Sequence, residues 1–204
     1  MIFLFALTLA LALQHADSAN IGPAATSEGD AINCRLDVPS YMQFAMAIDG
    51  EEKLAQTRHW KRVASRNAFM NEYELPHAIV VGAHSTRRIA FTSNAILAIL
   101  DLPDPAMLAR SEQVENAMDA APMIDALVGT GTMTRAQAEA AAPFRKFMGE
   151  RILKEVTEPA GQGESYGSHS VVARAISNAT THPGKTLYGC SYRLEMLDQD
   201  GAPL

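Results

Sequence analysis

The clearest alternation of apolar and polar positions lies near the end of the chain. There, small or polar residues such as Gly189 separate a row of large apolar ones. A period of two is typical of a strand that buries one face, so this segment predicts a strand. Residues 171–177 predict its antiparallel partner, and the turn-forming residues 181–185 join the two. The apolar row comprises Tyr188, Cys190, Tyr192, Leu194 and Met196.

A second pair of short β-rich segments lies in the middle of the chain. Residues 77–82 and 88–92 are rich in residues that favour strands, and residues 82–85 can form a turn between them. This pattern predicts a short hairpin.

Residues 39–56 are compatible with two structures. Asp37 is a good helix cap and a proline follows it in the first turn, which favours a helix. Alternating apolar residues before the turn signal Asp49-Gly50 permit a hairpin instead. Because the alternation does not continue beyond that turn, we favour a helix, a turn and a second helix over 51–73.

Further apolar segments predict helices. Residues 95–100 are entirely apolar and follow possible caps at Ser93 and Asn94, which predicts a helix at the centre of the core. Another helix is expected to start at Asp104-Pro105, and Thr134 with Gln137 forms a capping box. The clearest amphipathic helix is predicted beyond Pro143. Its apolar stripe comprises Phe144, Phe147, Met148, Ile152 and Val156.

These elements together predict an α+β fold: a mostly helical single domain at residues 37–204, with a small antiparallel β-sheet. The chain of 204 residues is long enough for one domain of ordinary size.

The start of the chain has the pattern of an export signal. An apolar run over residues 2–13 is too short to span a bilayer as a helix, and small residues suited to cleavage follow it. No Lys or Arg precedes this run, so an uncleaved anchor or a buried N-terminal helix is the alternative. We expect a signal peptide at residues 1–19, a flexible leader at 20–36, and no stable transmembrane span after cleavage.

Composition narrows the class of protein. The hydrophobic fraction of 48% and the charged fraction of 20% exclude a disordered chain and a polytopic membrane protein. The net charge of -6 argues against nucleic acid as a partner. Alanine is abundant and arginine outnumbers lysine, and GC-rich codons encode both, which suggests a bacterial source.

The two cysteines, Cys34 and Cys190, lie near opposite ends of the mature chain. An exported protein with one such pair is expected to form a disulfide bond, although two separate buried thiols are the alternative. The bond would hold the N-terminal segment beside the C-terminal strand.

Three arginines are the candidate binding residues. In the helix expected over 51–73, Arg58, Arg62 and Arg66 follow one another at a spacing of four, beside Trp60. Like charges at this spacing repel, so the row needs an anionic partner. That partner is either an acidic helix of the same chain or a small anionic ligand, such as a phosphate, a carboxylate or an envelope glycan.

The histidines carry a weaker signal. No spacing typical of a metal site or of a nucleophilic serine occurs, and no nucleotide or haem motif is present, so no metal and no cofactor are expected. A hydrolase site assembled from distant histidine and serine residues remains the alternative function. Its candidate histidines are His59, His77, His84 and His169.

The sequence therefore predicts a periplasmic or secreted protein that binds an envelope component or a small anionic ligand. It does not determine whether the protein is an enzyme, which ligand it binds, or its oligomeric state.

Overall fold

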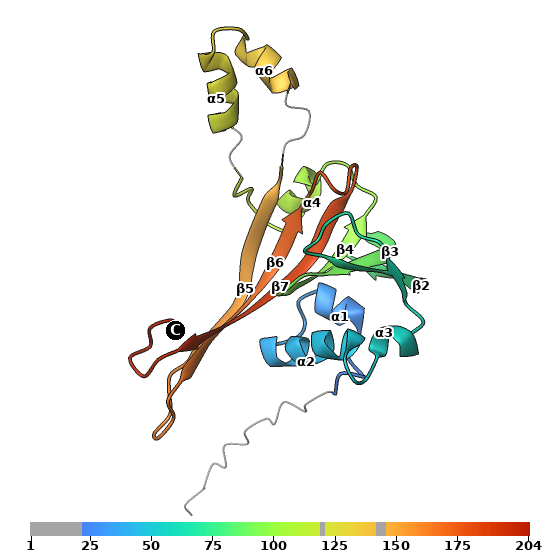
Figure 1. Cartoon of the computed structure of the whole chain (residues 1–204), viewed down its shortest axis with the longest axis vertical. Helices are drawn as coiled ribbons and strands as arrows, with labels where there is room; N and C mark the ends of the chain where they lie inside the picture. Colours follow the sequence, from blue (N-terminus) through green and yellow to red (C-terminus); the bar gives the residue numbers. More distant parts are fainter. Residues whose placement is uncertain (1–21, 119–120, 142–145) are drawn as a thin grey trace, which may run out of the picture.

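Seven antiparallel strands form one sheet in the computed structural model of the protein, which describes residues 22–118, 121–141 and 146–204. The strand order is β1-β2-β3-β4-β7-β6-β5. The first four strands form a meander, and the last strand, β7, pairs with β4, so β6 and β5 extend the sheet (Figure 1). The strands are β1 (Lys61–Val63), β2 (Asn71–Val81), β3 (His84–Phe91), β4 (Ala95–Leu100), β5 (Met148–Glu158), β6 (Gly167–Ser177) and β7 (Thr186–Leu197).

The expectation of a mostly helical domain with a small sheet is wrong, because in the described residues the strands together contain more residues than the helices. Six helices are present there, and most are short. They are α1 (Glu28–Ile32), α2 (Val38–Asp49), α3 (Leu54–Thr57), α4 (Ala106–Ser111), α5 (Ala121–Gly129) and α6 (Arg135–Ala141).

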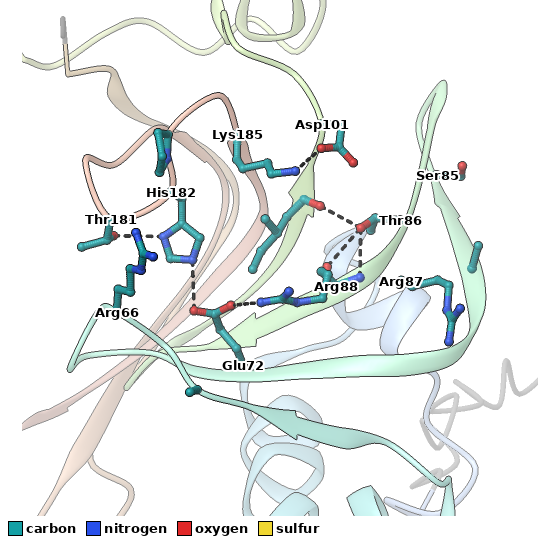
Figure 2. A pocket seen from close by; sticks show the side chains of 14 residues that line it. Arg66, Glu72, Ser85, Thr86, Arg87, Arg88, Asp101, Thr181, His182 and Lys185 are labelled. Carbon is teal, nitrogen blue, oxygen red and sulfur yellow. Dashed lines mark hydrogen bonds and ion pairs between the residues drawn. The ribbon is translucent and has the colours of Figure 1, made fainter.

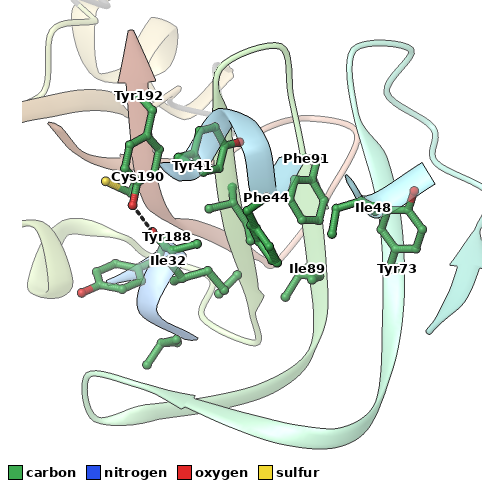
Figure 3. Packing of buried hydrophobic residues seen from close by; sticks show 14 of the residues in the cluster. Ile32, Tyr41, Phe44, Ile48, Tyr73, Ile89, Phe91, Tyr188, Cys190 and Tyr192 are labelled. Atoms are coloured by element: carbon green, nitrogen blue, oxygen red, sulfur yellow. Dashed lines mark hydrogen bonds between the residues drawn. The ribbon is translucent and has the colours of Figure 1, made fainter. Parts of the chain in front are cut away.

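Helices α1, α2 and α3 gather on one face of the sheet (Figure 1). The main core lies between them and the strands (Figure 3). Tyr41 of α2 stacks on Tyr192 of β7 with ring centroids 4.0 Å apart, and Phe44 lies 6.1 Å from Phe91 of β3. Burial of these large apolar rings is the main force that holds the helices on the sheet.

The predicted disulfide bond is confirmed. Cys34 and Cys190 are bonded, with their Cα atoms 5.3 Å apart, which ties the residues after α1 to the middle of β7. Ala31 and Ile32 of α1 are fully buried. The second half of the segment expected to be a flexible leader, 20–36, therefore belongs to the folded core. The expected signal peptide at 1–19 lies outside the described residues.

The apolar segment 95–100 forms the strand β4 rather than a helix. Ile96 and Ala98 contact the main core beneath the helices, while Leu97 and Ile99 belong to a smaller apolar cluster on the opposite face. A strand that is covered on both faces needs apolar residues at every position, so it shows no period by which to distinguish it from a buried helix.

The strongest helical pattern in the sequence also belongs to a strand. From Met148 onward it forms β5, which pairs with β6 from Met148 to Glu158. The register shifts between Ile152 and Lys154, so one extra residue lies in β5 at that point. A spacing of four, as between Met148 and Ile152, places two residues on one side of a helix and equally on one face of a strand, so this pattern does not distinguish the two structures.

The helix expected over 51–73 is wrong as well. Only the short α3 forms in this segment, and His59 follows it with a φ of 57°, in the left-handed region. The chain then enters β1 and the first part of β2. Because this segment does not form one helix, Arg58, Arg62 and Arg66 do not lie in a row along a helix face.

Other expectations are confirmed. Residues 39–49 are helical rather than a hairpin, because they belong to α2, and Asp37 caps that helix by accepting a hydrogen bond from the Ser40 N–H at 2.8 Å. The hairpins β2–β3 and β6–β7 form, with longer strands than expected.

Candidate functional site

A pocket of about 630 Å³ lies on the face of the sheet opposite α1–α3 (Figure 2). Glu72 of β2 points into it, while its neighbour Tyr73 points into the main core, because adjacent residues of a strand face opposite sides. Residues of β3 and β4 form the floor, and the connection between β6 and β7 forms one wall. The size is within the range of small-molecule sites.

Glu72 is the centre of the polar network in this pocket. Its side chain is only 2% exposed and forms an ion pair with Arg88. Its other carboxylate oxygen, Oε1, lies 3.0 Å from Nε2 of His182. A buried carboxylate is costly unless it is paired and hydrogen-bonded, and both conditions are met here.

These contacts determine the acidity of Glu72. Burial is the largest single influence and by itself raises the pKa of the carboxyl group. Hydrogen bonds from Ser65, Arg88 and His182 act in the opposite direction, and together with the charge interaction with His182 they hold the pKa below its ordinary value. Glu72 is thus a carboxylate at neutral pH.

The register of the sheet explains how Arg88 reaches Glu72. Arg88 lies opposite Glu74 in the β2–β3 pair, so its side chain shares a face with Glu72, two residues earlier on β2. Thr86 supports this part of β3: its hydroxyl donates to the Ile99 carbonyl at 2.7 Å and accepts from the Arg88 N–H at 3.0 Å.

His182 comes from the β6–β7 connection. Its backbone N–H donates to the Ala179 carbonyl and its own carbonyl accepts from the Lys185 N–H, so the connection is a hydrogen-bonded turn. The ring lies between two partners, because Nδ1 is 3.0 Å from the Thr181 hydroxyl and Nε2 faces Glu72. The Thr181 hydroxyl, the His182 imidazole and the Glu72 carboxylate are therefore connected in series at hydrogen-bonding distances.

The remaining charges around the pocket are unevenly paired. Lys185 forms an ion pair with Asp101, and Arg87 lies 3.3 Å from a carboxylate oxygen of Glu74. The guanidinium of Arg66 makes no ion pair or hydrogen bond within the described part of the chain. Arg88, Lys185 and Arg87 are thus paired with Glu72, Asp101 and, outside the lining, Glu74, which leaves the positive charge of Arg66 uncompensated.

Arg66 comes from the connection between β1 and β2, and it is the predicted arginine that lines this pocket. Arg58 instead closes the helical layer: it pairs with Glu28 at 3.0 Å and donates to the carbonyls of Ala24 and Thr26. Its guanidinium also lies 5.7 Å from the ring centre of Trp60.

The other two predicted binding residues are also away from the pocket. Trp60 is buried in the main core. Arg62 lies on β1, where it pairs with Asp49 and donates to the Asn71 side chain. The helical row of three arginines does not form, and Arg58 and Arg62 have partners in the same chain.

The four histidines of the alternative function lie on different elements. His59 follows α3, His77 is on β2, His84 is on β3, and His169 on β6 contacts Thr157 and Glu155. The histidine that lines the pocket and contacts Glu72 is His182, which lies in the turn predicted at residues 181–185. No spacing could have revealed it, because 110 residues separate His182 from Glu72.

Comparison of the chain with known proteins finds no relative. No protein-family model matches the chain, and no curated protein or solved structure is significantly similar to it. In the described ranges, no cluster of His, Cys, Asp and Glu could hold a metal ion. No helix in the same ranges is long and apolar enough to cross a membrane.

Proposed function

We propose that the protein is a binding protein for a small anionic ligand, and that the pocket around Glu72, Arg88 and His182 is its site. The unpartnered guanidinium of Arg66 at the edge of the pocket is the observation that carries the proposal. Arginine presents several N–H donors in a planar fork, which matches the oxygens of a phosphate or a carboxylate.

The network around Glu72 supports the same proposal. Glu72 neutralises the charge of Arg88. Their ion pair places polar groups at the base of the pocket, beside the smaller apolar cluster of the sheet. The Arg88 side chain remains 39% exposed, so part of it is accessible from the pocket. A ligand anion would then meet Arg66 and Arg88 together, while its approach to the buried carboxylate is limited.

The compartment is part of the proposal. A disulfide bond between Cys34 and Cys190 persists in oxidising surroundings and is rare in the cytosol. Together with the apolar start of the chain, this supports a periplasmic or secreted protein, with an envelope component as a possible source of the ligand.

A matched pair of arginine variants tests the proposal. Isothermal titration with inorganic phosphate should give weaker binding for Arg66→Ala by about tenfold or more, because a charge-assisted hydrogen bond contributes about 1.5–3 kcal/mol. Arg62→Ala removes an equally charged, exposed arginine that lies away from the pocket, and it should bind phosphate like the wild type. If both variants bound phosphate equally more weakly than the wild type, the cause would be a general charge effect. Absence of phosphate binding by the wild type would refute the proposal.

A hydrolase is the second candidate, because Thr181, His182 and Glu72 form a line of hydroxyl, imidazole and carboxylate at 3.0 Å spacings. This is the arrangement in which a base activates a nucleophile and a third group orients the base. Thr181→Val should then abolish hydrolysis of p-nitrophenyl acetate. Thr57→Val, on α3, is the matched control and should retain it. Equal rates for both variants would exclude Thr181 as a nucleophile.

A further inference from the structure

A second hollow, of about 430 Å³, adjoins the pocket and shares Arg66 and Thr181 with it. Phe69 and Lys146 are among the other residues that line it. A ligand held by Arg66 in the first pocket can therefore extend into the second hollow without leaving the surface.

Phe69 is unusual among the aromatic residues of the described chain, because it is 87% exposed. The loop that carries it is nevertheless held by local hydrogen bonds. The Phe69 N–H donates to the Asn67 side chain at 3.0 Å, and the Asn67 N–H donates to the Ser65 hydroxyl at 3.0 Å. Met70, the next residue, is buried and anchors the loop to the sheet. The ring is thus presented to solvent by an ordered turn.

The charges around Phe69 have one sign. Arg66 and Lys146 are cations, and no Asp or Glu is among the described residues that line this hollow. Neither cation forms an ion pair within the described residues. An exposed aromatic ring alone is common on protein surfaces, but here it adjoins two unpaired cations and a pocket.

We propose that the anionic ligand carries a flat apolar ring, which lies against Phe69 while its anionic group lies at Arg66. This inference rests on the proposed function and adds the chemical class of the ligand. Aromatic rings stack favourably in offset or edge-to-face geometry, and removal of both ring surfaces from water adds to the attraction. A ligand with a ring of this kind uses both hollows, whereas a simple anion uses only the first.

Two phosphate monoesters of the same charge test this inference by titration calorimetry on the disulfide-bonded protein. Phenyl phosphate should bind about tenfold tighter than methyl phosphate, which corresponds to about 1.4 kcal/mol. Phe69→Ala should remove this preference and leave the affinity for methyl phosphate unchanged. Phe69→Tyr keeps a ring and should retain the preference. Met46→Ala, which removes another exposed apolar side chain on α2, should behave like the wild type.

The outcomes separate this inference from the proposed function. Equal affinity for the two esters would overturn the inference while the site for anions remained. A preference for phenyl phosphate that persists in Phe69→Ala would also overturn it, because the ring would then bind elsewhere. Failure of both esters and of inorganic phosphate to bind would remove the proposed function itself.

Discussion

Replacement of Glu72 by glutamine should destabilise the protein although it hardly changes the size of the side chain. The carboxylate is 2% exposed and accepts from Arg88 and His182, whose side chains are 39% and 9% exposed. Removal of one partner of a buried ion pair costs about 3–5 kcal/mol. Because water reaches part of Arg88, we expect a smaller loss of about 2–3 kcal/mol from the free energy of unfolding.

Glu74→Gln is the matched control for this change. Glu74 lies two residues further along β2, and its pairing with Arg87 involves side chains that are 40% and 52% exposed. An exposed pair of this kind contributes less than about 1 kcal/mol. For a domain of this length, each kcal/mol corresponds to about 2–4 °C in melting temperature. Circular dichroism melts should therefore show a fall of about 5–10 °C for Glu72→Gln and a far smaller one for Glu74→Gln.

The difference between wild type and Glu72→Gln should also depend on pH. Because the pKa of Glu72 is lowered by folding, the unfolded chain binds this proton more readily than the folded protein. The stabilisation is therefore complete above the ordinary value of 4.5 and is lost as the pH falls through the lower folded-state pKa. Thermal melts from about pH 7 down to the pH at which the protein unfolds should show that the difference in melting temperature between wild type and Glu72→Gln narrows below about pH 5. Equal melting temperatures for the wild type and Glu72→Gln, or a difference between them that does not depend on pH, would refute this explanation of the network.

Three other changes test the fold, each by thermal melting. Cys34→Ser should lower the melting temperature clearly and a reductant should mimic it, because the bond closes a loop with a sequence separation of 156, which the chain-entropy model values at about 5 kcal/mol; no shift with either treatment would contradict a stabilising bond. Arg58→Ala should destabilise the protein by about 2 kcal/mol while Arg62→Ala should not, because only Arg58 bonds to backbone carbonyls and contacts rings of the core; equal effects would count against this distinction. Gly189→Ala should prevent stable folding, since the added Cβ would lie 2.0 Å from a carbonyl oxygen of β4; a near-normal melt would show that the strands can separate there.

Local signals identified several elements correctly. The cap at Asp37 marked the start of α2, and Thr134 with Gln137 marked the start of α6, where the two side chains bond to each other's backbone N–H groups. The alternation around Cys190 identified β7. These features depend on residues within a few positions of one another, so the sequence displays them directly.

The helical predictions failed where tertiary contacts decide the structure. The segment 95–100 could satisfy a buried helix or a buried strand equally well, and only pairing with β3 and β7 selects the strand. In β5 the apolar spacing of four suits a helix and a strand alike, and pairing with β6 along its length selects the strand. Propensity is a weak guide when partners far along the chain supply the hydrogen bonds.

The candidate site shows the same limit. The sequence places Arg66 in a helical row that does not form, and this residue lines the pocket because the connection between β1 and β2 carries it there. No local pattern marks Glu72 or His182 as a site residue, because their partners lie far away in the sequence.

The sequence by itself determined the cysteine pair, the capped helices and the final hairpin, because each depends on residue type or on contacts between near neighbours. The tertiary structure alone decided that strands dominate the described fold and that Glu72, Arg88 and His182 meet. The physical reason is that a sheet takes its hydrogen bonds and its buried partners from distant segments. Strand order, here with β7 beside β4, is therefore what brings residues 110 positions apart into one network.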